Sequence, residues 1–281
     1  MINNRDNTEQ SVKESIQDIT QESTQEQTQQ QFKNVFVLTN TTDNQIKSLY
    51  VTSLATTIRL ALFNGIKVFP LFSGNIDSST MAKNELLNSL KDTEYDSVVF
   101  INDDLAWDPI SFVSCVLSKE DVVALPVVKK TLGNVVFDLD MDTTDIEKND
   151  EGLIKVKHAS TGFLKVSNKV MTELMDSSVS VTNNTGNEVK NVFEFQVKDG
   201  QFFNDSVVLC HKIKDMGYDI WLNPQTTCGQ LTDNLYAVDF ATALDQNLNP
   251  QVPNTDTVTP AEGSTGATDA PKDDGIKSLY E

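Results

Sequence analysis

The chain has 281 residues, of which 38% are hydrophobic and 22% charged, with 22 basic and 41 acidic side chains. A net charge of −19 argues against a surface that binds nucleic acid or anionic lipid through charge alone. No apolar run reaches the roughly 20 residues that span a bilayer, the amino terminus lacks a secretory pattern, and the three cysteines form no CxxC pair. We therefore expect a soluble, reduced, cytoplasmic protein, in the host cytoplasm if the chain is viral.

Both ends of the chain have the composition of tails. Residues 1–31 are polar and glutamine-rich, and residues 247–281 are rich in proline, threonine and acidic side chains. Such segments bury too little apolar surface to offset their ordering entropy, so we expect both to be disordered around a folded part, residues 32–246. The string IKSLY occurs at residues 46–50 and again at 276–280. Chance is the simplest interpretation, and a tail that imitates the first helix is the alternative.

The first half of the folded part alternates short apolar runs with helical patterns. The runs at residues 34–38, 67–72, 97–101 and 121–126 predict strands. Apolar residues at helical spacing predict helices over 47–63, 79–91 and 109–117, the first ended by Asn64-Gly65 and the last begun by Pro109. This order predicts an α/β fold, a mostly parallel sheet with helices on both faces.

The second half is less regular. It predicts strands near residues 153–156, 162–166 and 219–223, and a further strand at 192–196. Helices are expected at residues 168–175 and 205–216.

Polar side chains follow two strands of the predicted sheet. The first strand ends in Thr39 and Asn40, and Asn102, Asp103 and Asp104 follow the third. Ligands of open parallel sheets bind at the carboxyl ends of the strands. No GxGxxG follows the first strand and no P-loop pattern occurs, so adjacent carboxylates here favour an oxygen-liganded divalent cation. The alternative is that Asp103 and Asp104 only cap the turn into the next helix.

The segment at the third strand resembles a known family. Residues 95–109, YDSVVFINDDLAWDP, are similar to the DxD region of GT-A glycosyltransferases, notably the family 2-like enzymes common in bacteriophages. Three further pieces follow the family's order. Residues 79–85 (STMAKNE) resemble its "ARN" helix start, and 158–164 (HASTGFL) resemble its "GTGF" loop. Residues 204–210 (NDSVVLC) with 216–224 (MGYDIWLNP) resemble its "ED" helix and following strand, so the resemblance covers about residues 34–236.

The resemblance implies a fold, an activity and a site. It implies a GT-A fold that transfers a sugar from a nucleotide-diphospho-sugar, above all a UDP-sugar, to an acceptor hydroxyl with inversion. Asp205 would be the general base, and Asp104 with Asn102 and Gln230 would hold Mn2+ or Mg2+. The residues that the resemblance assigns to nucleotide-sugar binding are Thr39, Asn40, Lys83, Asn84, Asn102, Asp103, Trp107, Thr161 and Gly162.

Four positions depart from the family pattern. Asn102 replaces the first DxD aspartate, Asn204 replaces the "ED" glutamate, and Gln230 takes the place of a metal-holding histidine. Lys83 replaces the "ARN" arginine, which keeps the charge without the bidentate fork. Amide oxygens bind hard cations more weakly than carboxylates do, so these replacements predict a weakened metal affinity, a metal-independent catalysis or a lost activity.

Two other classes of function therefore stay open. One is a pseudo-glycosyltransferase that binds a nucleotide-sugar or glycan without turnover. The other is an interaction protein whose tails bind protein partners. Two residues also have purely structural interpretations, because Asp205 could cap a helix and Trp107 could be a core residue.

Overall fold

A computed structural model describes residues 32–41, 45–74, 78–130, 134–226, 228–231, 235–237, 240–241 and 251–253. Residues 1–31 and nearly all of 247–281 lie outside this part of the chain. The predicted disorder of the tails and the second IKSLY string are therefore not tested by it.

A seven-stranded sheet forms the centre of the molecule, in the order β2-β1-β3-β11-β5-β16-β9. β1 is parallel to β2 and β3, and β5 is parallel to β16, whereas β11 is antiparallel to both β3 and β5 and β9 is antiparallel to β16. Five strands thus share one direction, which confirms the predicted mostly parallel sheet. The strands are β1 (Lys33–Asn40), β2 (Ile66–Ser73), β3 (Ser97–Ile101), β5 (Val122–Ala124), β9 (Ile154–Val156), β11 (Phe163–Ser167) and β16 (Ile220–Leu222).

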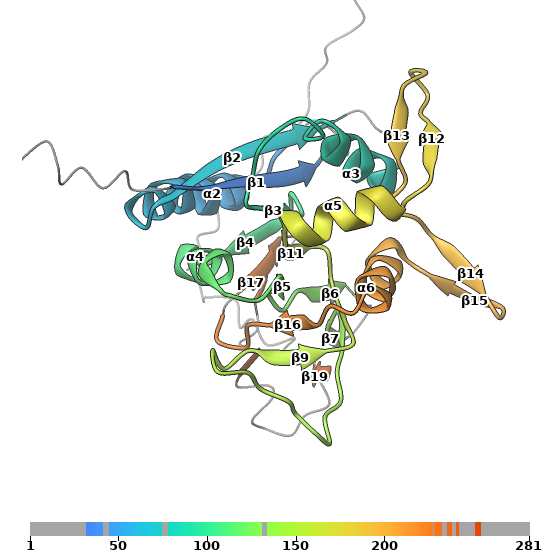
Figure 1. The fold of residues 1–281 in the computed structure, drawn as a ribbon. Coiled ribbons are helices and arrows are strands. Elements are labelled where there is room, and N and C mark those ends of the chain that lie inside the picture. Colours follow the sequence, from blue (N-terminus) through green and yellow to red (C-terminus); the bar gives the residue numbers. More distant parts are fainter. Residues whose placement is uncertain are drawn as a thin grey trace, which may run out of the picture.

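Helices cover both faces of this sheet, as predicted (Figure 1). Side chains of α2 (Ser48–Phe63) and α4 (Pro109–Leu117) share one buried cluster with one face of the strands. The second cluster contains side chains of α3 (Ser79–Asn88), α5 (Asn168–Ser177) and α6 (Asp205–Asp215). Neighbouring strand residues alternate between the two, since Val37 belongs to the first cluster and Leu38 to the second.

Local sequence explains where the helices begin and end. Asp108 caps α4, because its side chain accepts hydrogen bonds from the backbone N–H groups of Ile110 and Ser111, each at 3.2 Å. Pro109 occupies the first helical position, as the sequence predicts. Helix α2 ends at Phe63, and Gly65 then adopts a φ of 72°, which favours glycine.

Short strands surround the sheet. β4 (Leu105–Trp107), β17 (Cys228–Leu231) and β18 (Leu235–Ala237) form one small sheet. β6 (Val128–Lys130), β7 (Asn134–Phe137) and β19 (Gln251–Pro253) form another, so three residues of the segment predicted as a carboxyl-terminal tail pair with β7. β8 (Leu139–Asp140) pairs with β10 (His158–Ala159).

Two hairpins project from the same side of the molecule (Figure 1). They are β12 (Ser180–Thr182) with β13 (Glu188–Lys190), and β14 (Gln196–Lys198) with β15 (Gln201–Phe203). The strand predicted at residues 192–196 is wrong, because residues 192–195 are irregular and only Gln196 begins β14. The physical reason is that the backbone N–H and C=O of Phe193 both bond to the side chain of Asn84 instead of to a neighbouring strand.

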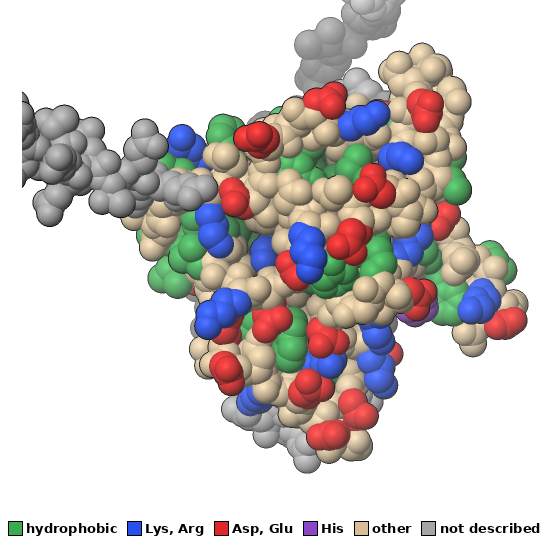
Figure 2. All heavy atoms as spheres, in the orientation of Figure 1, with side chains coloured by type: hydrophobic (Ala, Val, Ile, Leu, Met, Phe, Trp, Pro, Cys, Tyr) green, Lys and Arg blue, Asp and Glu red, His purple; other side chains and the backbone are tan. Residues whose placement is uncertain are grey.

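The visible surface mixes both signs of charge. Figure 2 shows Lys and Arg side chains interspersed with Asp and Glu on this face. Hydrophobic side chains are exposed on and beside the β14–β15 hairpin, where Phe195, Val197 and Phe202 are 54%, 72% and 66% exposed. In the described part of the chain, no helix is both long and apolar enough to cross a membrane.

Lys165 is a buried cation in the middle of the sheet. It lies in β11 with 5% of its surface exposed, and its Nζ donates to the backbone oxygen of Glu120 at 2.5 Å. Burial lowers the pKa of Lys165 to about 8. The unfolded chain keeps this proton until about pH 10, so it binds more protons than the folded chain between about pH 8 and 10. The free energy of unfolding therefore gains a term that rises with pH in that window.

We expect Lys165 to change how stability depends on pH in alkaline solution. Burial raises the pKa of Cys115, Cys210 and Cys228 to about 12, so as the pH rises past about 8.5 the unfolded thiols lose protons that the folded ones keep, and the free energy of unfolding falls. The Lys165 term opposes this fall between about pH 8 and 10. The urea midpoint of the wild type should therefore fall less steeply with pH in that window than the midpoint of Lys165→Met. Equal slopes in the two proteins would contradict the assignment.

Candidate functional site

The carboxyl edge of the central sheet gathers the segments that the sequence singles out. Because β11 runs against β3, the loop before β11 reaches the end of β3, and the backbone N–H of Asn102 donates to the C=O of Gly162 at 2.9 Å. The side chain of Asn40, at the end of β1, donates to the hydroxyl of Ser79 at the start of α3, at 3.1 Å. The ends of two strands, one loop and one helix thus meet at this edge.

Four buried or nearly buried side chains form the Lys83 cluster: Lys83, Thr161, Asp205 and Ser206. Lys83 Nζ lies 2.8 Å from Asp205 Oδ2 and 2.9 Å from Thr161 Oγ1. Thr161 also receives a contact from Ser206, whose Oγ lies 2.8 Å from Thr161 Oγ1 and accepts from the Thr161 N–H at 3.2 Å. The Lys83 and Asp205 side chains are 8% and 13% exposed, so the ion pair is almost out of water. Residues from α3, the β11 loop and α6 are joined here by charge and hydrogen bonds.

Asp205 does not cap its helix. Asn204 is the N-cap of α6, and its Oδ1 accepts from the backbone N–H of Val207 at 2.9 Å. Asp205 is the first helical residue, where the helix dipole favours a negative charge. The structure thus gives Asn204 the capping role that the sequence left open for Asp205, and it directs the carboxylate of Asp205 to Lys83.

Gly162 allows a close approach between the DxD-like turn and the β11 loop. A Cβ at this position would lie 3.2 Å from each of three side-chain atoms, Asn102 Nδ2, Ser160 Oγ and Val127 Cγ1. A side chain here would need these neighbours to shift by a few tenths of an ångström, so space rather than backbone angle favours glycine. The amide of Asn102 is held against this loop, one residue from Thr161 of the Lys83 cluster.

Asp104 and Gln230 form a second polar pair at the same edge. β17 pairs with β4, and Gln230 Nε2 donates to Asp104 Oδ2 at 3.0 Å. The other amide atom, Gln230 Oε1, is buried without a hydrogen-bond partner in the described structure. The nearby Cys228 is also buried, and its pKa is raised by that burial and by the charge of Asp104. Within the described residues, no group of three or more His, Cys, Asp or Glu side chains could hold a metal ion.

Two predicted binding residues are enclosed by packing. Thr39 is fully buried, and its hydroxyl bonds to the hydroxyl of Tyr50 at 2.5 Å. Burial raises the pKa of that tyrosine well above its usual range, and the nearby charge of Asp103 raises it further. Trp107 is 4% exposed, and its Nε1 donates to Thr57 Oγ1 at 2.9 Å. Trp107 is therefore a core residue, which was the structural alternative to a role in binding.

Asn84 clamps a backbone segment. It is 1% exposed, and its amide accepts from the N–H of Phe193 and donates to the C=O of Phe193, each at 2.8 Å, while also donating to Asn191. Removing such a partner leaves buried polar groups unpaired. We expect Asn84→Ala to lower the free energy of unfolding by about 2 kcal/mol in urea titrations. Asn88→Ala, one turn further along α3 and half-buried, is the control, and equal effects would contradict the clamp.

Two residues at this site, Ser206 and Phe193, are not among those predicted from the sequence. Ser206 completes the Lys83 cluster, and the Phe193 ring lies 5.5 Å from Lys83 Nζ, in the range of a cation–π contact. Ser206 directly follows the candidate base, and a hydroxyl there was the available signal. Phe193 had none, because its neighbours come from a helix more than 100 residues earlier.

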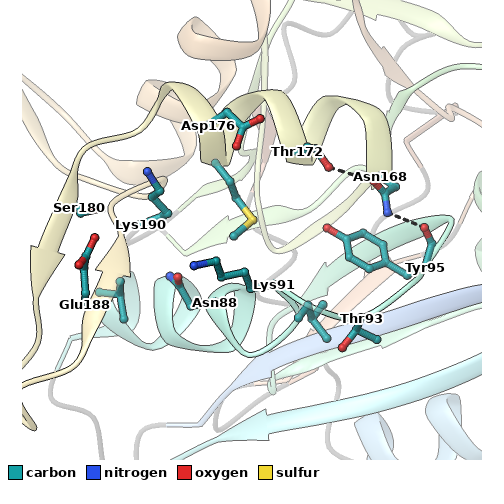
Figure 3. Close-up of a pocket in the computed structure, with 13 residues that line it drawn as sticks. Asn88, Lys91, Thr93, Tyr95, Asn168, Thr172, Asp176, Ser180, Glu188 and Lys190 are labelled. Atoms are coloured by element: carbon teal, nitrogen blue, oxygen red, sulfur yellow. Dashed lines mark hydrogen bonds between the residues drawn. The ribbon is translucent and has the colours of Figure 1, made fainter.

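A cavity of about 480 Å3 lies at the opposite edge of the sheet (Figure 3). Tyr95, before β3, and Asn168, after β11, line it, and Asn168 Nδ2 donates to the Tyr95 C=O at 2.7 Å. Lys91 and Glu188 give its rim both signs of charge. Because it lies at the amino end of β3, this cavity is separate from the Lys83 cluster.

Among the comparisons with known proteins, only the comparison with solved structures finds similar proteins. No protein-family model matches the chain, and no curated protein matches it. The crystal structure of GalNAc-T7 with UDP, GalNAc and Mn2+ is similar at 10% identity and a TM-score of 0.38, over 72% of this chain and 44% of that one. The inositol-1-phosphate CTP transferase of T. maritima is similar at 12% identity and a TM-score of 0.35, over 72% of this chain and 89% of that one. The chain therefore spans less than half the length of the first of these proteins.

Proposed function

We propose that the protein is a glycosyltransferase of the GT-A type, similar to family 2 enzymes, which moves a sugar from a nucleotide-diphospho-sugar to an acceptor hydroxyl with inversion. One observation carries the proposal. The nearly buried Lys83–Asp205 ion pair joins α3 to α6 at the carboxyl edge of the sheet, beside Thr161 and the loop that contacts Asn102. Nucleotide ligands of open α/β sheets bind at that edge.

The donor is assigned to the ends of β1 and β3. Asn40, Asn102 and Asp103 are half-buried there, and we assign their amide and carboxylate groups to the binding of a nucleoside diphosphate, with UDP as the first candidate. Thr39 and Trp107 are buried, so in this proposal they support this edge of the sheet and do not contact the donor. Lys83 and Thr161 are assigned to the side of the transferred sugar, next to the base.

The Asp104–Gln230 pair fits a divalent cation in the chemistry of its oxygens. The unpaired Gln230 Oε1 and the Asp104 carboxylate are hard ligands of the kind that Mg2+ and Mn2+ prefer. Asp104, Gln230 and Asn102 would hold the cation, which when bound supplies positive charge to the diphosphate leaving group. One carboxylate and two amides are a weak ligand set, so we expect low affinity for the metal.

Asp205 is assigned as the general base. As the acceptor oxygen forms its bond to the anomeric carbon, the bond from that carbon to the diphosphate breaks, and Asp205 takes the proton of the hydroxyl. The products are an inverted glycoside and a nucleoside diphosphate. Lys83 is a positioning residue in this scheme, because it holds Asp205 Oδ2 while Oδ1 accepts from the N–H of Ser206 at 3.0 Å.

A binding protein without turnover is the second candidate. The observation that favours it is that amides, Asn102, Asn204 and Gln230, stand where the family has two carboxylates and an imidazole. The side chain of Asn204 caps α6, and that of Gln230 donates to Asp104. Donor binding with neither transfer nor donor hydrolysis would support this candidate over the enzyme.

Thermal unfolding with nucleoside diphosphates tests both candidates. We expect UDP or another nucleoside diphosphate at millimolar concentration to raise the melting temperature, because a ligand that binds the folded state alone stabilises it. The increase should be smaller in Asp104→Ala when Mn2+ is present. Asp108→Ala, a capping carboxylate outside the site, provides a control for general loss of stability. If no nucleoside diphosphate raises the melting temperature, with or without Mn2+, both candidates are wrong.

A further inference from the structure

The two helices over one face of the sheet, α2 and α4, carry almost no charge. They lie side by side and contain 16 and 9 residues, of which Arg59 alone is charged. At the chain's average of 22% charged residues, a layer of this size would include five or six. The helices on the other face are not depleted in this way, since α6 has four charged residues among eleven. A surface from which charge is depleted is typical of the core of a protein–protein interface.

The outward side of α2 is apolar as well. Four of its residues repeat at spacings of four, three and four, which is the stripe of a two-stranded coiled coil: Val51, Ala55, Ile58 and Leu62. All four side chains are exposed. The buried residues of the helix occupy other positions, so the stripe lies on the solvent side of α2.

Threonine hydroxyls on the outward side of α2 bond to the helix itself. Thr52 donates to the backbone oxygen of Ser48 at 3.0 Å, and Thr56 donates to that of Thr52 at 2.9 Å. Each hydroxyl thereby uses its one proton within the helix and has none to donate to a polar partner. These bonds make the outward side of α2 still better suited to an apolar partner.

The apolar surface continues from α2 onto its neighbours. Eight large hydrophobic residues are exposed on this side, and we refer to them as the α2–α4 face: Leu49, Val51, Ile58, Leu62 and Phe63 of α2, Phe72 of β2, and Ile110 and Leu117 of α4. The Phe72 ring contacts that of Tyr50 in α2, with centroids 6.2 Å apart. Figure 2 shows hydrophobic side chains gathered on the left of the molecule, where Figure 1 places α2 and α4.

The α2–α4 face has the area of a stable interface. Its residues are about half exposed on average, and side chains of this size have roughly 200 Å2 of surface each, so the face offers about 800 Å2. Each partner of a standard protein–protein interface buries about the same area.

We propose that the α2–α4 face binds the same face of a second copy of this chain, in a two-fold symmetric dimer. An apolar face is complementary to its own copy across a two-fold axis, and homodimer interfaces are more apolar than others. The net charge of −19 repels two copies, but these two helices contribute one positive charge and no negative one. Ala55, near the middle of the stripe, lets the two α2 helices approach closely. The dimer does not depend on the proposed function, because α3 and α6 lie on the other face of the sheet.

Sedimentation velocity of the full chain at micromolar concentrations tests the proposal. We expect twice the 31.1 kDa mass of one chain. Val51→Glu and Leu62→Glu, at the two ends of the stripe, should each weaken the dimer by about 100-fold, because each buries an unpaired charge in the interface. Val197→Glu is the control, because it adds the same charge to an apolar residue that is 72% exposed on the β14–β15 hairpin, and it should leave the dimer unchanged.

All three of these sites are exposed, so the variants should fold, and thermal unfolding checks that they do. A wild type that stays monomeric would overturn the proposal. So would stripe variants that remain dimeric, or a control that dissociates to the same extent. A monomer that sediments with phosphatidylcholine vesicles would assign the face to a membrane surface, and this result too would overturn the dimer.

Cysteine cross-linking tests where the two copies meet. The native thiols Cys115, Cys210 and Cys228 are buried, so an added cysteine on the surface is the reactive one. Under mild oxidation Ala55→Cys should form a disulfide-linked dimer, because the middle of the stripe lies next to its own copy whichever way the helices run. Thr56→Cys, also exposed but on another side of the helix, should stay largely unlinked. Equal linking in the two variants would overturn the contact through the stripe.

Discussion

Asp205→Asn is expected to reduce sugar transfer by about 100-fold or more while leaving donor affinity nearly unchanged. The amide retains an oxygen that can accept from Lys83 Nζ, but it cannot take a proton at neutral pH. Because Asn204 caps α6, the start of the helix does not depend on the charge of residue 205. A selective loss of rate is therefore what a general base predicts.

Calorimetric titration with the donor, beside initial-rate transfer assays, measures the two effects separately. Asp215→Asn is the matched control, because it makes the same chemical change at the last residue of the same helix, where the side chain is exposed. Full transfer in Asp205→Asn would exclude the base assignment. If the wild-type protein binds donor without turnover, the binding protein becomes the better account, with Asn102 and Gln230 as the first positions to restore to the family residues.

The regular part of the fold was predictable because its signals are local. Apolar runs such as residues 97–101, fully buried in β3, and capped helices such as α4 carry their pattern in consecutive residues. The short strands β12 to β15 carry none, since each has three residues of which at most one is buried, and their pairing is decided by the partner strand. The same holds for Phe193, where a side chain 109 residues away replaces a strand partner.

The sequence predicts where the residues of the candidate site lie in the fold, but not which of their side chains contact one another. The order of strands and helices, with the family resemblance, predicts that Asn102 and Asp104 follow β3 at the carboxyl edge of the sheet, and both lie there; that a ligand binds at this edge stays a prediction. No local pattern joins Lys83 to Asp205, because the two residues lie 122 positions apart and meet only in the folded chain. The antiparallel insertion of β11 brings Thr161 beside Lys83 at the same place. The sequence also could not distinguish Asn84, used up on backbone groups, from a residue free to meet a ligand.

Lys83→Met should lower the free energy of unfolding by about 3 kcal/mol, the low end for breaking a buried ion pair. The variant leaves the Asp205 carboxylate, 13% exposed, without its counter-charge, and that residual exposure to water is the reason for the low end. Removing both charges in Lys83→Met with Asp205→Leu should restore most of the loss, because no buried charge is then unpaired. Lys83→Arg should cost less than Lys83→Met, since the positive charge remains.

Urea unfolding of the wild type, of Lys83→Met, of Asp205→Leu and of the double variant forms a double-mutant cycle that measures the coupling between the two side chains. Effects that add without coupling would show that the 2.8 Å contact contributes nothing to stability. The double variant also separates folding from chemistry. It should be nearly as stable as the wild type and yet lack transfer, because it has no base. Loss of transfer in a protein that unfolds normally cannot be attributed to a damaged fold, so the Lys83–Asp205 pair would then be needed for the reaction itself.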